Sequence, residues 1–120
     1  EVQQKVFDWI EVGKSCYGAH KLCAELLAAA GHPDIVSDPT TQTGFCHGLG
    51  HGVGLQVHES PRLGGTERNK DTFKPGSVFT LEPGVYYPDK GYGVRYEDTC
   101  YLDDDGVLHR LTDEPAAMLI

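Results

Sequence analysis

Phe45-Cys-His47-Gly-Leu-Gly-His51-Gly-Val-Gly-Leu-Gln-Val-His58 is the stretch around which the other segments of the sequence can be arranged. It contains three of the six histidines and a glycine at every second position from Gly48 to Gly54. Glycine lets the backbone turn freely and approach other groups closely. Imidazoles on so flexible a backbone need tertiary support to keep any geometry, so the stretch predicts a functional site.

The alternation of Val53, Leu55 and Val57 predicts a strand from Gly52 to His58. His51 and His58 are separated by an odd number of residues, so an unbroken strand would place them on opposite faces. A bulge, or a strand that begins after His51, would bring them together, and the glycines permit either.

Two amphipathic helices are predicted before this stretch. Apolar residues of the first follow a helical spacing at Val2, Val6, Trp9 and Ile10. The second helix begins after Ser15, a good N-cap, and ends at Gly31, a good C-cap. His20 lies outside its apolar stripe and is expected to be solvated, whereas His32 is expected to interact with the last helical carbonyls.

The remainder of the chain has the pattern of strands. Residues 59–76 are predicted to be a long charged loop, and residues 77–87 and 94–102 to be strands. A turn at residues 103–106 then leads into a return strand at 107–111, where His109 is expected to be exposed. This order predicts an α+β fold in which two helices pack on one face of a curved, mostly antiparallel sheet.

Composition limits the class of protein. The 120 residues suffice for one domain, and the net charge of −8 argues against a nucleic-acid partner. No apolar run approaches the roughly 20 residues that span a bilayer, so no membrane partner is expected. The four cysteines lack metal or redox spacing; we predict reduced thiols, with Cys23 and Cys100 buried, in a cytoplasmic protein, and one disulfide remains the alternative.

Two glutamates are the other candidates for a site, because Glu82 and Glu97 each lie within an apolar strand-like segment. A buried carboxylate is costly unless a cation or several donors accompany it. Arg95 is the simplest partner, but it shares a strand face with Glu97 and could serve only one carboxylate well. A metal ion bound by both glutamates and a histidine would satisfy both, and such ligands suit Mn, Co, Fe or Zn.

Three motifs in this order resemble a known family: His47–Glu59, Phe79–Gly84 and Val94–Thr99. The chain resembles the C-terminal half of a "pita-bread" metallopeptidase, the family of methionine aminopeptidases, Xaa-Pro aminopeptidases and prolidases. The resemblance covers essentially all 120 residues. It implies half of the pita-bread fold, with residues 1–120 as the C-terminal portion of the catalytic domain.

The resemblance also implies metal ligands. Enzymes of this family hold two divalent ions with two Asp, one His and two Glu. His51 matches the ligand histidine, Glu82 the glutamate that binds one metal and shuttles a proton, and Glu97 the glutamate that bridges both metals. Two metals can lower the pKa of a bridging water and produce a nucleophile at neutral pH, and Glu82 can pass the proton to the leaving amine.

Three further residues match substrate-contacting positions of the family. His58 matches a catalytic histidine near the scissile bond, which can donate a hydrogen bond to the developing oxyanion. His47 matches an outer active-site histidine, and Arg95 an arginine beside the bridging glutamate. We expect His47, His58 and Arg95 to bind substrate, with Arg95 orienting a carboxylate.

The two Asp ligands of the family lie before the first helix, and no matching pair is present here. The first residue is Glu1 and the only methionine is Met118, so we expect the chain to be a piece of a longer polypeptide. Alone, it is expected to be inactive, to bind at most one divalent ion weakly, and to expose apolar surface that favours a homo-oligomer.

The residues around the second glutamate distinguish the branches of the family. Arg95-Tyr-Glu97-Asp98 and the short interval after Glu82 resemble prolidases and Xaa-Pro aminopeptidases, which implies a peptide substrate with proline in the second position. A methionine aminopeptidase, a metal-free hydrolase and a non-catalytic binding module of the same fold remain alternatives. The metal (Mn, Co or Zn) and the choice between dipeptidase and aminopeptidase stay open.

Overall fold

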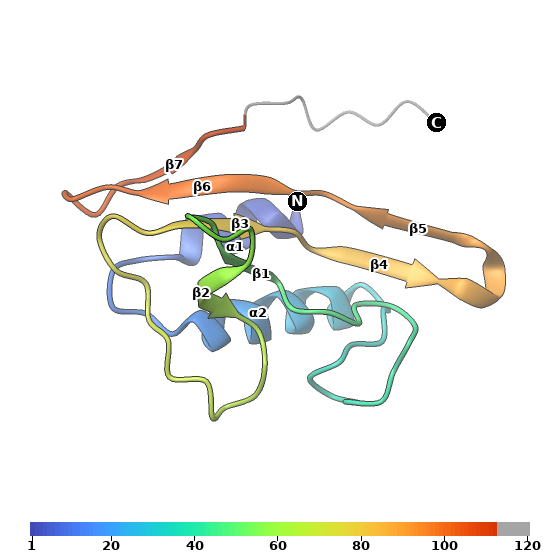
Figure 1. Cartoon of the computed structure of the whole chain (residues 1–120). Coiled ribbons are helices and arrows are strands. Elements are labelled where there is room, and N and C mark those ends of the chain that lie inside the picture. The colour runs from blue at the N-terminus through green and yellow to red at the C-terminus, as the bar shows by residue number, and fades with distance from the viewer. Residues whose placement is uncertain (113–120) are drawn as a thin grey trace.

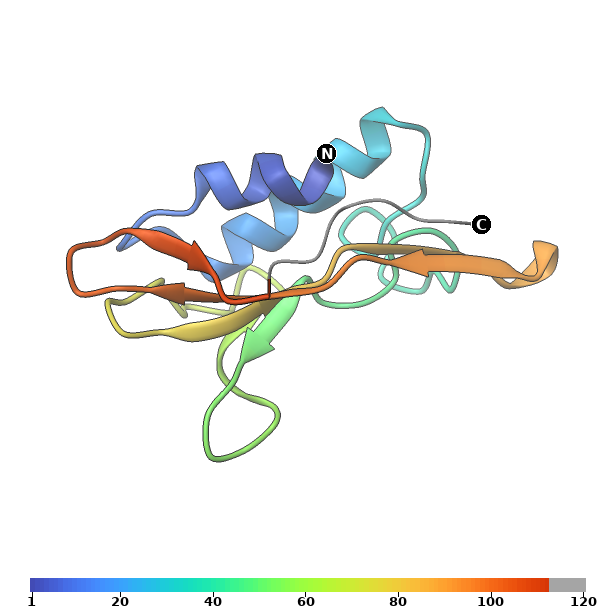
Figure 2. The ribbon, with the colours of Figure 1, turned by 90° about the horizontal axis from the view of Figure 1, so that it is seen from above.

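Two helices cover one face of an antiparallel sheet in the computed structural model, which describes residues 1–112 (Figures 1 and 2). The helices are α1 (Val2–Trp9) and α2 (Cys16–Ala29). The sheet has the order β2-β1-β3-β6-β7, formed by Glu59–Leu63, Gly50–Gly52, Val78–Leu81, Asp98–Leu102 and Leu108–Arg110. A two-stranded ribbon of β4 (Gly84–Tyr87) and β5 (Tyr92–Arg95), closed by the short 3-10 helix η1 (Pro88–Lys90), extends from it. The predicted α+β architecture is confirmed.

The ends of α2 follow the sequence signals. The Ser15 side chain accepts a hydrogen bond from the Gly18 N–H at 3.0 Å, as an N-cap does. Gly31 has a φ of +94°, and the His32 N–H donates to the Leu27 carbonyl at 3.0 Å, which closes the last turn. The His32 imidazole itself contacts the Tyr87 hydroxyl, so its side chain links α2 to the ribbon instead of capping carbonyls.

The core lies between the helices and the sheet. Its largest fully buried side chains are Phe45, Phe73, Phe79, Leu49, Leu63, Leu81 and Leu102. Cys23 and Cys100 are buried within it as predicted, and all four cysteines are free thiols in the structure. Burial raises the pKa of both thiols to about 12, so they remain protonated at neutral pH. No helix among residues 1–112 is long and apolar enough to cross a membrane.

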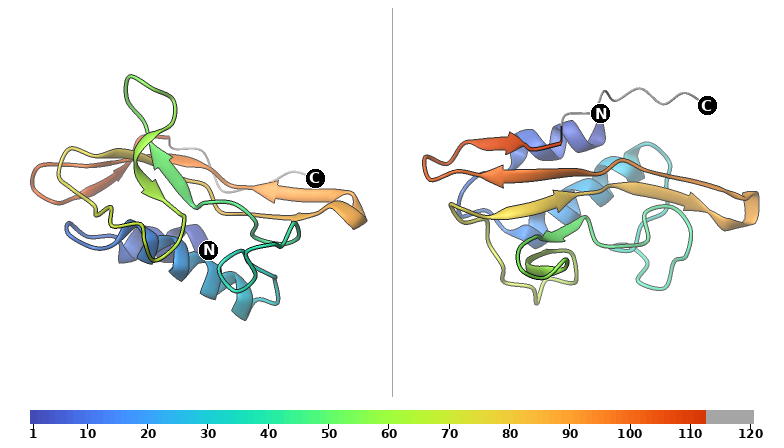
Figure 3. Two further views of the ribbon diagram at one scale, coloured as in Figure 1. Left: turned by 60° about the horizontal axis from the view of Figure 1, so that its bottom comes forward. Right: turned by 45° about the horizontal axis from the view of Figure 1, so that its top comes forward.

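The predicted strand from Gly52 to His58 is wrong. After the short strand β1, residues 53–58 form a loop that projects from the sheet on the side away from the helices, and the chain returns as β2, within the segment predicted to be a loop (Figures 2 and 3). Leu55 and Val57 are 107% and 72% exposed, so their alternation does not mark a packed strand. At the base of the loop the Val53 N–H donates to the Val78 carbonyl at 2.9 Å, and within the loop the Gly54 N–H donates to the Gln56 carbonyl at 3.2 Å.

The glycines of β1 have a steric cause. A Cβ on Gly50 would lie 1.9 Å from the Thr80 carbonyl oxygen, and one on Gly52 would lie 2.0 Å from that of Ser60. Neighbouring backbone therefore occupies the space of a side chain at both positions. β1 can enter between β2 and β3 only because these residues are glycine.

The two long predicted strands are each interrupted, at residues 82–83 and 96–97. β3 pairs with β6 up to Leu81 and Asp98, and β4 pairs with β5 from Gly84 and Arg95 onward, in one continuous register. Figure 3 shows the two ladders as one long ribbon. The interruption therefore leaves Glu82 opposite the segment Tyr96–Glu97, in a gap between two regular ladders.

His20 is buried rather than solvated, with 1% of its surface exposed. The sequence prediction was wrong because Phe45, far along the chain, packs against the imidazole with 5.3 Å between ring centroids. Its Nδ1 atom is buried without a hydrogen-bond partner among residues 1–112. Burial, with smaller effects of nearby charges, lowers the pKa of His20 to about 4. His109, in contrast, is exposed as predicted.

Candidate metal centre and active site

His51 presents one ring nitrogen to the site and uses the other to fix its orientation. Its Nδ1 lies 3.0 Å from the Gly52 carbonyl, which can only accept, so Nδ1 carries the hydrogen in this contact. Neutral His51 therefore has its lone pair on Nε2. Metal-binding histidines are commonly oriented in this way, with one nitrogen donating to a carbonyl and the other free to bind.

The His51 Nε2 atom lies 3.5 Å from the Glu82 Oε2 atom, and both side chains are largely buried. When His51 is neutral and Glu82 is ionised, both facing atoms are acceptors and repel each other. A proton or a metal ion between them removes this conflict. The pair thus has the donor chemistry and the geometry to share a divalent ion.

Glu82 has one further charged neighbour. The Arg95 Nη1 atom lies 3.9 Å from Glu82 Oε1, a long ion pair in which half of the arginine side chain is exposed. Solvent screening weakens such a contact. The simple alternative of an Arg95–Glu82 ion pair is thus present, but it involves the Oε1 atom and not the Oε2 atom that faces His51.

Glu97 is exposed, which corrects the prediction that its strand buries it. β5 ends at Arg95 and β6 begins at Asp98, so Glu97 lies in the gap where no neighbouring strand covers it. Within residues 1–112, no group of three His, Cys, Asp or Glu side chains is arranged to hold a metal ion. The structure therefore joins His51 and Glu82, and it places Glu97 across the gap without bringing it into such a group.

His58 lies beside His51, with 4.3 Å between the ring centroids. The sequence left two ways to achieve this, and the structure uses an irregular register between His51 and Gly52 followed by the hairpin loop. The two histidines share a hollow of about 400 Å³ with Arg62. His58 is exposed in this hollow, so its imidazole is accessible to a bound molecule.

Tyr86 connects the remaining predicted residues and was missed by sequence reasoning. Arg95 Nε donates to the Tyr86 hydroxyl at 2.7 Å, and His47 Nε2 lies 3.1 Å from the same oxygen. His47 Nδ1 is 2.6 Å from the Gly48 carbonyl and therefore donates, so Nε2 of neutral His47 accepts from Tyr86. The hydrogen bond to Tyr86 is the main cause that raises the pKa of Arg95 above its usual range.

The position of Tyr86 has a signal in the sequence, because two glycines make room for its ring. A Cβ on Gly93, the residue paired with Tyr86, would lie 2.6 Å from the Tyr86 ring, and one on Gly84 would lie 2.7 Å from the hydroxyl. The sequence signal is thus a glycine paired with the aromatic residue, Gly93, and another two positions before it, Gly84. Together they leave room for a ring that lies flat across the ribbon.

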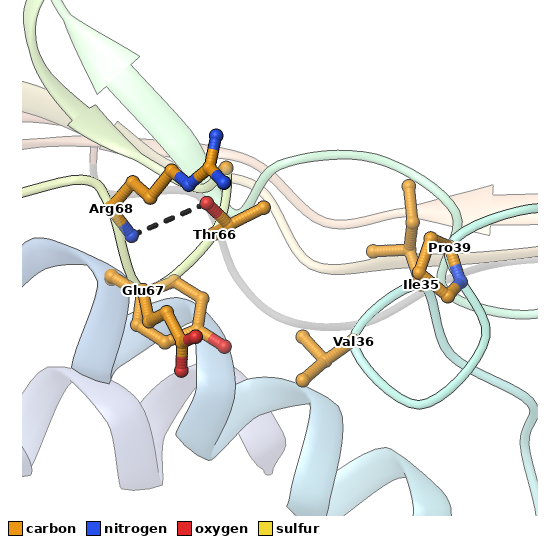
Figure 4. Close-up of a pocket in the computed structure, with 8 residues that line it drawn as sticks. Ile35, Val36, Pro39, Thr66, Glu67 and Arg68 are labelled. Atoms are coloured by element: carbon orange, nitrogen blue, oxygen red, sulfur yellow. Dashed lines mark hydrogen bonds between the residues drawn. The ribbon is translucent and has the colours of Figure 1, made fainter.

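A larger hollow lies elsewhere. It measures about 550 Å³ and is formed by Tyr17 of α2, the segment with Ile35, Val36 and Pro39, and the loop Gly65–Arg68 (Figure 4). None of the predicted site residues lines it. Figure 4 shows the Thr66 hydroxyl held by the Arg68 N–H at 3.3 Å, a contact within the loop.

Comparison with known proteins identifies the family of this chain. The model of metallopeptidase family M24 matches residues 1–104. The Xaa-Pro dipeptidase of Pyrococcus furiosus is 34% identical over 119 residues, which cover 99% of this chain and 30% of that protein. The Xaa-Pro dipeptidase of Pyrococcus horikoshii is 34% identical over 106 residues, 88% of this chain and 27% of that protein. The chain thus spans less than a third of the length of these relatives.

Solved structures have the same fold over most of the chain. The Xaa-Pro dipeptidase from Bacillus anthracis superposes with a TM-score of 0.79 at 30% identity, covering 99% of this chain and 30% of that one. The X-Pro aminopeptidase from Thermotoga maritima gives a TM-score of 0.76 at 29% identity, covering 97% and 29%. The chain is thus a part of the pita-bread fold and belongs to metallopeptidase family M24.

Proposed function

We propose that this chain contributes the His–Glu–Glu side of a dinuclear metal centre that removes the N-terminal residue from peptides with proline in the second position. The observation that carries the proposal is the contact between the His51 Nε2 and Glu82 Oε2 atoms, where two acceptors face each other at 3.5 Å. Glu97, opposite this pair in the strand register, supplies the third ligand once its carboxylate turns toward a bound ion.

Each polar side chain has a role in this proposal. The chemistry supplied by bound divalent ions is activation of a water molecule and polarisation of the scissile carbonyl. Glu82 accepts the proton of the attacking water and delivers it to the leaving amine. His58, accessible beside His51, donates a hydrogen bond to the developing oxyanion.

Substrate binding falls to His47 and Arg95, which are joined through the Tyr86 hydroxyl. The charged guanidinium of Arg95 lies near Glu82 and can orient a carboxylate. His47 and Arg95 both bond to the Tyr86 hydroxyl. Movement of one side chain on substrate binding therefore changes the hydrogen bond of the other.

The remaining ligands must come from outside these residues. A dinuclear site of this kind needs two more carboxylates, and we assign them to a part of the complete protein outside this match, since the chain spans less than a third of its relatives' length. One imidazole and several carboxylates suit Mn, Co or Zn. The free buried thiols support a cytoplasmic location.

The choice of substrate rests on relatives. Proteins described as Xaa-Pro dipeptidases from two Pyrococcus species match this chain at 34% identity. The tertiary amide before proline needs a dedicated peptidase, and the Arg95-Tyr-Glu97-Asp98 sequence resembles that branch.

A pair of peptides tests the proposal in the complete polypeptide. We expect an Xaa-Pro dipeptide to be cleaved, a Met-Ala peptide to be cleaved much more slowly, and both activities to require added Mn²⁺, Co²⁺ or Zn²⁺. Preference for Met-Ala would replace the Xaa-Pro assignment by a methionine aminopeptidase. Cleavage without any bound or required metal would contradict the metallopeptidase mechanism, and absence of both cleavage and metal would favour a binding module.

A further inference from the structure

The gap between the two ladders has a chemical cause, because Pro83 has no N–H. In the continuous register, Pro83 lies opposite Tyr96, and the Tyr96 N–H donates to the Pro83 carbonyl at 3.1 Å. A regular antiparallel pair would return a second hydrogen bond from residue 83 to the Tyr96 carbonyl. Proline cannot donate it, so the ladder is weakened at the position next to both Glu82 and Glu97.

The Gln3 side chain of α1 donates to the carbonyl that Pro83 cannot reach with a hydrogen bond. Its Nε2 donates to the Tyr96 carbonyl at 3.4 Å and to the Leu81 carbonyl at 3.2 Å. These two carbonyls belong to the residues that directly precede Glu97 and Glu82. One carboxamide therefore ties together the two backbone segments that carry the two candidate metal-binding carboxylates.

The Gln3 side chain is held in its own turn. It is 4% exposed, and its Oε1 atom accepts a hydrogen bond from Arg110 Nη2 at 3.3 Å. Arg110 Nε lies 3.4 Å from the buried carboxylate of Asp98, and the Arg110 guanidinium lies over the Phe7 ring. Arg110, itself held by Asp98, thus fixes the oxygen end of the carboxamide, and the NH₂ end with its two donors points toward the gap.

We propose that Gln3 is a positioning residue that sets the separation of Glu82 and Glu97. The role rests on the proposed function, since Gln3 acts on the two carboxylates through the backbone of Leu81 in β3 and of Tyr96 in the gap. The carboxamide supplies the donor that Pro83 lacks and holds the Leu81 and Tyr96 backbones together. Without it, the Leu81 and Tyr96 carbonyls lose the donor that they share, and the separation of the two carboxylates is less tightly fixed.

Amide hydrogen exchange of the 120-residue chain tests the backbone part. In Gln3→Met, we expect the Tyr96 amide to exchange at least tenfold faster relative to the Cys100 amide in the middle of the β3–β6 ladder. Gln4→Met is the matched control, because Gln4 on the same helix donates to Asp8 on the exposed surface. Val6→Ala, which loosens the buried face of α1, should raise both exchange rates together.

An unchanged Tyr96-to-Cys100 ratio in Gln3→Met would overturn the proposal. If Gln3→Met fails to fold, Gln3→Asn replaces it; this variant keeps the carboxamide but shortens the side chain by one methylene. The same change of ratio, in smaller degree, is expected there, and an unchanged ratio would again count against the role of Gln3.

Titration with Mn²⁺ tests the effect on the carboxylates. We expect Gln3→Met to raise the dissociation constant at least fivefold, whereas Gln4→Met and Val6→Ala stay within twofold at a temperature where all variants are folded. Equal affinity in Gln3→Met and Val6→Ala would refute the positioning role and leave the proposed function standing. If the unsubstituted chain binds no Mn²⁺, the proposed function fails, and the exchange ratio still decides whether Gln3 holds the gap.

Discussion

The His51 Nε2 and Glu82 Oε2 atoms face each other at 3.5 Å, although both are acceptors when the imidazole is neutral and the carboxylate ionised. The sheet creates this conflict: β1 is inserted between β2 and β3, and Glu82 follows directly after β3. The backbone on both sides is held, His51 by the Thr80 hydroxyl and Glu82 by the Leu49 carbonyl. A cation between the two side chains resolves the conflict without moving either strand.

The first prediction concerns the glycines of the histidine stretch. Gly50→Ala should destabilise the fold by about 3 kcal/mol, since its Cβ would lie 1.9 Å from the Thr80 carbonyl oxygen and displace β1 from β3. Gly48→Ala is the matched control, because the nearest atom would be 3.3 Å away. Its unfolding free energy should stay within about 1 kcal/mol of the original. Urea unfolding measures both, and equal losses would show that close approach is not the reason for Gly50.

The second prediction concerns the ring of Tyr86. Gly93→Ala should cost about 1–3 kcal/mol of unfolding free energy, because the new methyl group would meet the ring at 2.6 Å. In a Tyr86→Ala background the same change should cost much less. The two sites should thus couple by roughly 0.5–3 kcal/mol in a double-mutant cycle. Additive effects would contradict the flat placement of the ring across Gly93.

The third prediction concerns acid stability and His20. Its pKa is about 4 in the folded state against an ordinary value of 6.5, so the unfolded state binds the proton first as the pH falls. His20 therefore does not reduce the stability above pH 6.5, and it lowers the stability as the unfolded state takes up the proton between pH 6.5 and about 4. For a buried group with this shift, the loss amounts to about 2–3 kcal/mol by pH 4.5.

His20→Leu should therefore flatten the pH dependence of stability by that amount. The substitution also removes the buried Nδ1 atom that has no partner among residues 1–112, so no stability should be lost at pH 7. Urea midpoints at pH 7 and 4.5 give the comparison. A variant as acid-sensitive as the original chain would place the cause in other groups.

The fourth prediction concerns the loop that carries Leu55 and Val57. Both side chains are exposed, and the loop projects on the side of the sheet away from the helices (Figure 2). We expect the chain to self-associate through this apolar surface. Leu55→Ser with Val57→Ser should lower the apparent mass in sedimentation, whereas Val107→Ser, an exposed valine in the turn before β7, should not. Equal masses for all three proteins would exclude the loop as the contact.

Local signals predicted the elements whose ends depend on nearby residues. Ser15 and Gly31 bound α2 because capping is decided within one turn. The short motifs that contain His51 and Glu82 also predicted that these two side chains belong to one site, and they lie side by side in the structure. The break at Pro83 could have been predicted as well, because proline cannot donate to a ladder.

Other features depend on contacts between distant segments. His20 is buried by Phe45, and Gln3 reaches carbonyls near the other end of the chain, so no helical pattern could assign either. Glu97 was predicted to be buried from its apolar neighbours. It is exposed because its strand ends at the gap, and strand ends are the part of a pattern that sequence locates least well.

Calorimetric titration of the 120-residue chain with Mn²⁺ tests the central claim most directly. The account predicts a single, weakly bound ion, because His51, Glu82 and Glu97 offer one imidazole and two carboxylates. Binding should disappear in His51→Ala and in Glu82→Gln, and persist in His58→Ala, since His58 is placed to contact substrate. Binding that survives His51→Ala, or two tightly bound ions per chain, would contradict the assignment of these residues.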